Sequence, residues 1–205
     1  MDWANIINII IGVVTALVAG IGLPIALRKR KKQGPHKGEE LLLHLQGIGL
    51  NTYLPSEETI REKTGFQRFS STRLLYVIGI KEKNIQWINL IGISSQYGTN
   101  YYIDFQVNSP NLEIRKPKKT YLRIKKHSNP KHSSINWAGD KSFSLSLRFD
   151  YRLEELILKS EFQGSLEISP ELKKGYIRIR IPYALFSTEL FEAINLIAGH
   201  IKSEF

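Results

Sequence analysis

Apolar side chains follow two different patterns along this chain. Residues 6–27 are almost continuously apolar and contain no charged side chain. From Arg73 onward, several segments instead alternate apolar and polar residues. A period of two is typical of a strand with one buried face and one solvated face. The pattern therefore divides the chain into an apolar N-terminal segment and a β-rich body.

The alternation predicts seven strands. It is clearest in three segments, which are 99–108, 142–149 and 176–183. Weaker strand candidates are 74–80, 85–93, 120–126 and 155–162. Turn-forming Gly, Pro, Asn and Asp residues lie between these segments. Because strands with one solvated face argue against a parallel sheet, we predict a mainly antiparallel sheet, either open or folded into a sandwich.

Two segments of the β-rich body have helical signals instead. The last 19 residues place Leu190, Ile194, Ile197 and Ile201 on one helix face, with Ser187 or Thr188 as the N-cap. Such an amphipathic helix needs an apolar surface to cover, and the sheet offers one. Ser56 is placed to cap a second, short helix that begins with two glutamates. The predicted fold class is therefore α+β, with one domain over 39–205 and the C-terminal helix packed on its sheet.

The apolar segment 6–27 has the length of a membrane span. About 20 apolar residues are needed to cross the hydrocarbon core as a helix. A buried helix of a soluble protein rarely runs this far without a polar face. A cleaved signal peptide would begin with bases, whereas this chain begins Met1-Asp2-Trp3 and its bases follow the apolar segment. We therefore predict a retained transmembrane helix over 6–27.

A cluster of bases predicts the orientation of this span. The cluster directly follows the apolar segment and consists of Arg28, Lys29, Arg30, Lys31 and Lys32. Bases next to a span stay on the cytoplasmic side. The prediction is a single-pass plasma-membrane protein with residues 1–5 outside, a polybasic linker over 28–38 and a cytosolic domain. The same bases can contact anionic lipid headgroups, at about 1 kcal/mol each.

Small residues recur on one face of the predicted span. Gly12, Ala16 and Gly20 are spaced four residues apart, so they share that face. Small residues at this spacing let two helices approach closely in a bilayer. They are also common in any span, so a homo-oligomer through this face and a monomeric anchor both remain open.

Composition excludes several kinds of chemistry. The chain of 205 residues has no Cys, which removes disulfides, thiol nucleophiles and thiolate zinc sites. The net charge is +10, and half of it lies in residues 1–37, where six bases face the single acid Asp2. The remaining domain is only mildly basic, which is less than a dedicated nucleic-acid binder carries.

No catalytic or cofactor motif survives inspection. Residues 92–96 begin like a nucleophile elbow but end in Gln96 instead of Gly. Residues 47–52 fail the dinucleotide fingerprint at their last position. His127 and His132 are the only close pair of histidines, and a zinc site there would need distant ligands such as Asp140. We therefore predict no enzyme activity, no cofactor and no metal.

A basic stretch is the most pointed feature of the predicted domain. Between 115 and 131 the chain holds eight bases and no acid, which are Arg115, Lys116, Lys118, Lys119, Arg123, Lys125, Lys126 and Lys131. If 120–126 is a strand, Tyr121, Arg123 and Lys125 share its solvated face, as Tyr176, Arg178 and Arg180 share another. Were the two strands neighbours, this surface would suit phosphates of nucleic acid or of lipid headgroups. The alternative is that these bases only keep exposed strands soluble.

These observations favour a non-catalytic interaction domain held at the inner membrane face, which binds a protein partner or its own copy. Such a domain should expose an apolar or aromatic patch. The alternative is an anion-binding module that uses the basic stretch with Arg178 and Arg180. An enzyme of unfamiliar type is a third hypothesis, and it would need Asp104, Asp140 or Asp150 beside a His in a cleft.

Overall fold

The computed structural model describes residues 36–59, 71–81, 83–109, 111–125 and 134–205. The predicted span 6–27, with Gly12, Ala16 and Gly20, and the base cluster 28–32 lie outside these residues. Within the described ranges, no helix is both long enough and apolar enough to cross a bilayer. The membrane span therefore stays a prediction from the sequence.

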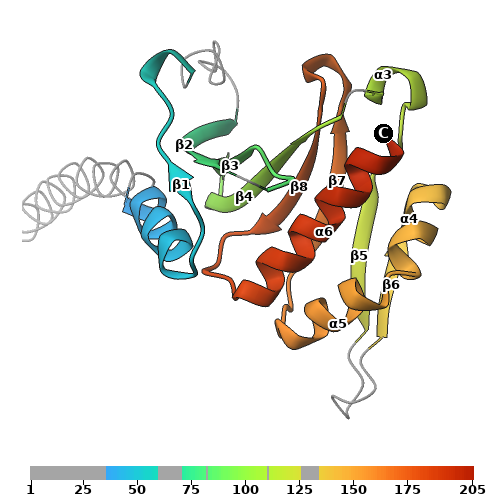
Figure 1. Ribbon diagram of the computed structural model, residues 1–205. Helices are drawn as coiled ribbons and strands as arrows, with labels where there is room; N and C mark the ends of the chain where they lie inside the picture. The colour runs from blue at the N-terminus through green and yellow to red at the C-terminus, as the bar shows by residue number, and fades with distance from the viewer. Residues whose placement is uncertain (1–35, 60–70, 82, 110, 126–133) are drawn as a thin grey trace, which may run out of the picture. The chain divides into compact units, whose positions relative to one another are not determined.

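The domain is built on one antiparallel sheet of eight strands (Figure 1). The strands are β1 (Thr52–Tyr53), β2 (Thr72–Ile80), β3 (Trp87–Ser95), β4 (Gly98–Asn108), β5 (Thr120–Lys125), β6 (Ser134–Ala138), β7 (Leu166–Glu171) and β8 (Tyr176–Pro182). Their order across the sheet is β1-β2-β3-β4-β8-β7-β5-β6. The predicted α+β class and antiparallel sheet are confirmed. All described strands belong to one sheet, so the sandwich alternative is wrong for this part of the chain.

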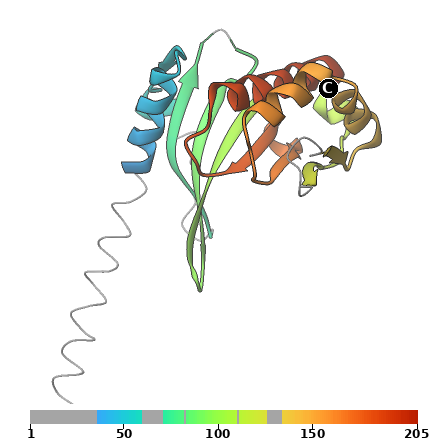
Figure 2. The same cartoon turned by 90° about the horizontal axis from the view of Figure 1, so that it is seen from below.

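Helices cover one face of this sheet. Figure 2 shows α4 (Lys141–Arg148), α5 (Tyr151–Lys159) and α6 (Thr188–Glu204) on the same side of the strands. A further helix over 36–47 places Leu41 and Leu45 in the same hydrophobic core. This helix includes residues 36–38, which the sequence assigned to the end of the linker. Shorter turns, α3 (Leu112–Arg115) and η2 (Leu172–Lys174), join β4 to β5 and β7 to β8.

The strand register separates the two faces of the sheet. On the helix side, Ile88 lies opposite Phe105, which lies opposite Ile179, and all three are buried in the core. One position along, the other face carries Asn89, Asp104, Arg180 and Glu167 in one row across β3, β4, β8 and β7. The apolar row supplies the stability, at about 1.5–3 kcal/mol for each fully buried side chain. The polar row instead carries charged side chains that pair with one another across the strands.

The C-terminal helix α6 matches its prediction. Ser187 caps it, because its Oγ accepts a hydrogen bond from Leu190 N–H at 3.3 Å. Its buried side chains are Leu190, Phe191, Ala193, Ile194, Ile197, Ala198 and Ile201. The helix runs along the apolar face of the sheet (Figures 1 and 2). The short helix predicted at Ser56 also begins there, since Ser56 Oγ accepts from Thr59 N–H at 3.3 Å.

Two predicted strands are wrong. Residues 142–149 and 155–162 were expected to be strands, but they fall largely in helices α4 and α5. Each helix begins at an aspartate N-cap: Asp140 accepts from Phe143 N–H at 3.2 Å, and Asp150 accepts from Leu153 N–H at 2.9 Å. Side chains four residues apart are then buried on one helix face in each. The capping aspartates outweighed the apparent period of two.

Candidate functional site

The two basic strands proposed as one surface are not neighbours. β7 lies between β5 and β8, so Tyr121 of β5 faces Glu167 of β7, which faces Arg180 of β8. The register does place the three side chains on the same face of the sheet, away from the core row. An acidic side chain therefore stands in the middle of the surface that the sequence predicted to be basic.

Arg178 and Arg180 are already occupied by carboxylates. Arg180 donates to both oxygens of Asp104, at 2.6 and 2.7 Å. Arg178 contacts Glu171 at 2.7 Å through Nη1 and Glu167 at 3.2 Å through Nη2. These five side chains form one ion network across β4, β8 and β7. The network leaves little positive charge for an external anion.

Burial is the main influence on the carboxyl group at the centre of this network. Removal from water raises the pKa of Asp104, and the hydrogen bonds and charges of Arg180 and Arg178 oppose that rise. The guanidinium of Arg180 also lies 5.3 Å from the ring centre of Tyr102. Asp104 and the arginines cross-link adjacent strands, and this explains why the sequence places charges in a central strand.

The other predicted basic residues lie at one end of the sheet or in β5. Arg115 ends α3, Lys116 follows it in a left-handed conformation (φ 45°), and Lys118 and Lys119 lead into β5, which contains Arg123 and Lys125. The Nζ of Lys119 lies 3.5 Å from Oε1 of Glu167, so these two side chains form an ion pair. Arg115, Lys116, Lys118 and Arg123 form no ion pair with any described residue. Lys126 and Lys131 fall outside the described ranges, as do His127 and His132.

A serine, a histidine and an aspartate form a hydrogen-bonded chain, and its Asp150–His200 pair is one of the Asp–His pairs that the third hypothesis requires. His200 of α6 lies between Ser146 of α4 and Asp150, the N-cap of α5. Its Nδ1 is 3.1 Å from Ser146 Oγ, and its Nε2 is 2.8 Å from Asp150 Oδ2. Burial by itself would raise the pKa of Asp150, but the hydrogen bonds from His200 and from Leu153 N–H outweigh it, and the pKa is lowered.

This chain of side chains has the nucleophile, base and orienting acid of a hydrolase, but its setting differs. Ser146 lies inside α4, where its backbone N–H is used by the helix. A hydrolytic serine instead needs nearby free N–H groups that hold the oxyanion. The arrangement ties α4, α5 and α6 together. A sequence signal for it exists only in the Asp150 N-cap, because the three residues come from separate helices.

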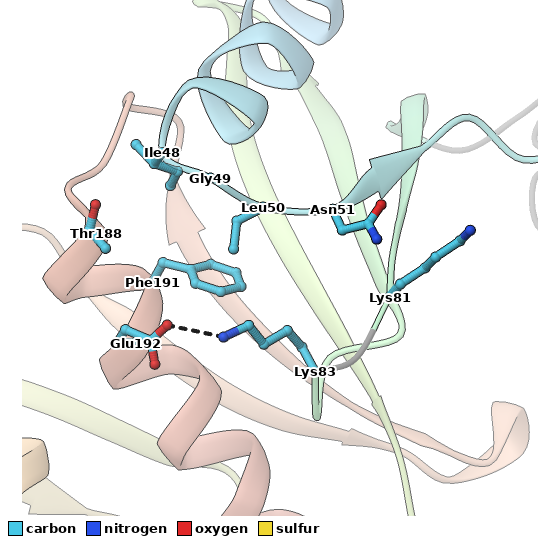
Figure 3. Close-up of a pocket in the computed structure, with 9 residues that line it drawn as sticks. All are labelled: Ile48, Gly49, Leu50, Asn51, Lys81, Lys83, Thr188, Phe191 and Glu192. Atoms are coloured by element: carbon cyan, nitrogen blue, oxygen red, sulfur yellow. Dashed lines mark hydrogen bonds and ion pairs between the residues drawn. The ribbon is translucent and has the colours of Figure 1, made fainter.

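A cavity of about 270 Å³ lies between the turn after helix 36–47, the β2–β3 turn and the start of α6. Figure 3 shows the side chains that line it. Lys83 points toward Glu192 and pairs with it at 3.2 Å, while Lys81 points away from the other lining side chains (Figure 3). Phe191, beneath Leu50, is fully buried. The accessible lining of the cavity is mainly polar. Lys83, its cation nearest to α6, is neutralised by Glu192.

Exposed apolar side chains gather where α4 meets α5. Leu145, Phe149 and Tyr151 are 50%, 65% and 79% exposed. Leu145 and Phe149 are four residues apart and so lie on the same side of α4, and Tyr151 opens α5 two residues later. We call these three residues the α4–α5 corner. Large apolar side chains that gather on a surface are typical of contacts with other proteins.

Comparison of the chain with protein-family models, with curated proteins and with solved structures finds no match. Within the described parts of the chain, no three His, Asp or Glu side chains lie close enough together to hold a metal ion.

Proposed function

We propose that this protein is a single-pass, membrane-anchored, non-catalytic domain that presents an interaction surface at the inner face of the plasma membrane. The anchor is the apolar segment 6–27, with Arg28–Lys32 on the cytoplasmic side. The interaction surface is the α4–α5 corner. Tethering raises the local concentration of the domain near other membrane proteins, so a modest contact suffices.

The α4–α5 corner is the observation that carries this proposal. Leu145 and Phe149 lie on the side of α4 opposite to the buried Phe143 and Leu147. They therefore contribute nothing to the core, although each exposes an apolar surface to water. Tyr151 adds a ring with a polar hydroxyl, a residue type enriched at interfaces.

The second hypothesis, anion binding by β5 together with β8, has weaker support. Arg178 and Arg180 are paired with Asp104, Glu167 and Glu171. An anion on this face would have to displace these carboxylates from two mostly buried guanidinium groups. The bases that stay unpaired lie mainly at the end of the sheet instead.

Site-specific photo-crosslinking tests the α4–α5 corner in the full-length protein in cells. A photoreactive phenylalanine at position 149 should give a crosslinked product, which Leu145→Ser or Tyr151→Ser should remove. The matched control is the same group at Tyr97, which is 90% exposed in the β3–β4 turn and should give no product. A product of twice the chain mass means a second copy, and another mass means a different protein. Equal products from both positions, or none from 149, would refute the proposal.

A further inference from the structure

One end of the sheet combines unpaired bases with exposed aliphatic side chains. It comprises residues of α3, the loop after it and η2, and we call it the basic tip. Its members are Ile114, Arg115, Lys116, Lys118, Leu172, Lys173 and Lys174. Arg115, Lys116 and Lys118 belong to the basic stretch predicted from the sequence, whereas the two aliphatic residues and the lysines of η2 do not.

The strand register brings the two halves of the basic tip together. β5 and β7 are antiparallel, with Thr120 opposite Ile168, so the chain that enters β5 lies beside the chain that leaves β7. Asn108 at the end of β4 lies opposite Tyr176 at the start of β8. α3 follows β4 and η2 precedes β8, so both project from the same end of the sheet (Figure 1).

The five bases of the basic tip form no ion pair with any residue that the structure describes. Glu113 is the one acid of α3. Glu171, which precedes η2, is held by Arg178 at 2.7 Å. Each base near an anionic membrane surface contributes about 1 kcal/mol.

The apolar residues of the basic tip favour lipid over nucleic acid. Ile114 is 81% exposed, and Leu172 is also exposed. Aliphatic side chains ringed by bases are the combination found on proteins that lie in the headgroup region of a bilayer. Single-stranded nucleic acid is instead bound through aromatic rings on which bases stack.

We propose that the basic tip docks onto the anionic lipids of the membrane that carries the anchor. The proposal rests on the proposed function, because the anchor keeps the tip near the bilayer. Ile114 and Leu172 enter the headgroup region, and the five bases contact lipid phosphates and carboxylates. Docking fixes the orientation of the domain and so determines which surfaces remain open to partners.

Fluorescence of a single cysteine tests the docking, since the chain has no other Cys. The full-length Ile114→Cys protein, labelled with a polarity-sensitive dye, is placed in nanodiscs of phosphatidylcholine or of phosphatidylcholine with phosphatidylserine. We expect a blue shift only with phosphatidylserine, which high salt reverses. The matched control is a dye at Tyr97→Cys, which lies at the opposite end of β4 and should show no shift.

Charge-neutralising variants complete the test. Lys173→Gln and Lys174→Gln should each lower the ratio of docked to free domain about fivefold. The exposed Arg73→Gln, in β2 away from the tip, should leave that ratio unchanged. Three results would overturn the docking alone. In the first, the dye on a nanodisc-incorporated protein shows no shift, and in the second it shifts equally without phosphatidylserine. The third result is that single-stranded nucleic acid, but not anionic vesicles, displaces the tip from the nanodisc. Failure to enter nanodiscs would overturn the anchor, and the docking with it.

Discussion

Arg180 binds Asp104 through two parallel hydrogen bonds, from Nε to Oδ1 at 2.6 Å and from Nη2 to Oδ2 at 2.7 Å. The pair joins β4 to β8 in the middle of the sheet, on the face opposite the helices. Both side chains are largely withdrawn from water. Because a lone charge at such a site is costly, each partner makes the other necessary.

Removal of one partner should therefore cost more than removal of both. We expect Asp104→Ala to lower the free energy of unfolding by about 3–5 kcal/mol. The Asp104→Leu/Arg180→Met double variant should lose less than the sum of its single variants. Urea unfolding of residues 38–205, which hold the described core, measures this. The exposed Glu155–Lys159 pair is the control, and its removal should leave the midpoint unchanged. Additive losses at 104 and 180 would contradict the coupling.

The lowered pKa of Asp150 predicts how stability depends on pH. A carboxyl group with a lower pKa in the folded state contributes stability above its unfolded pKa, which is about 3.9. That contribution is lost as the pH falls through the folded pKa. Asp150→Asn keeps an N-cap but cannot ionise, so its stability should fall less steeply below about pH 5 than that of the wild type. Unfolding midpoints across this pH range test it. A variant with the same acid dependence as the wild type would exclude Asp150 as the cause.

Gly139 is a position where only glycine fits. Its φ is +129°, and an added Cβ would lie 2.0 Å from the Lys119 carbonyl oxygen and 2.7 Å from the Thr120 Cα. Gly139→Ala should therefore destabilise the domain by at least about 2 kcal/mol. Gly47 lies at the end of helix 36–47, and a Cβ added there would meet no atom within 4 Å. Gly47→Ala should therefore stabilise the domain by up to about 1 kcal/mol. Thermal unfolding of the two variants measures both changes in stability. If Gly139→Ala were as stable as the wild type, the turn at Gly139 would have another geometry.

Leu145 and Leu147 distinguish a helix from a strand at 141–148. In a strand they would share one face and respond alike to substitution. In α4, Leu147 is buried and Leu145 is half-exposed. Leu147→Ser should therefore cost about 2–5 kcal/mol, whereas Leu145→Ser should stay within about 0.5 kcal/mol of the wild type. Similar losses at the two positions would favour the strand and remove the basis of the α4–α5 corner.

The same residues explain where the sequence misleads. The apolar residues that alternate with polar ones over 143–149 are of two kinds. Phe143 and Leu147 face the core, whereas Leu145 and Phe149 face the solvent. A pattern argument assumes that every apolar residue is buried, and Leu145 and Phe149 break that assumption. The segments 99–108 and 176–183 largely coincide with β4 and β8, as predicted, because their aliphatic and Phe side chains all face the core. These side chains are Ile103, Phe105, Val107, Ile177, Ile179 and Ile181.

Long-range pairing accounts for the remaining differences. The sequence showed that Arg178 and Arg180 share a face, but it could not show that β7 lies beside β8 and brings Glu167 and Glu171 to them. The basic tip has the same origin, since α3 and η2 are about 60 residues apart in the chain. Local pattern determines which way a side chain points, and strand order determines what it meets.

The orientation of the predicted anchor gives the last prediction. With bases 28–32 inside, a cysteine at Ala4 should react with a membrane-impermeant maleimide in intact cells. A cysteine at Tyr97 should react only after the membrane is permeabilised. The absence of natural cysteines means that each signal comes from one position. Neutralising Arg28, Lys29 and Arg30 should make both positions react in part of the population, since the bases determine the orientation. Reaction of Tyr97→Cys in intact cells would place the domain outside, and a partner on the inner face would then be excluded.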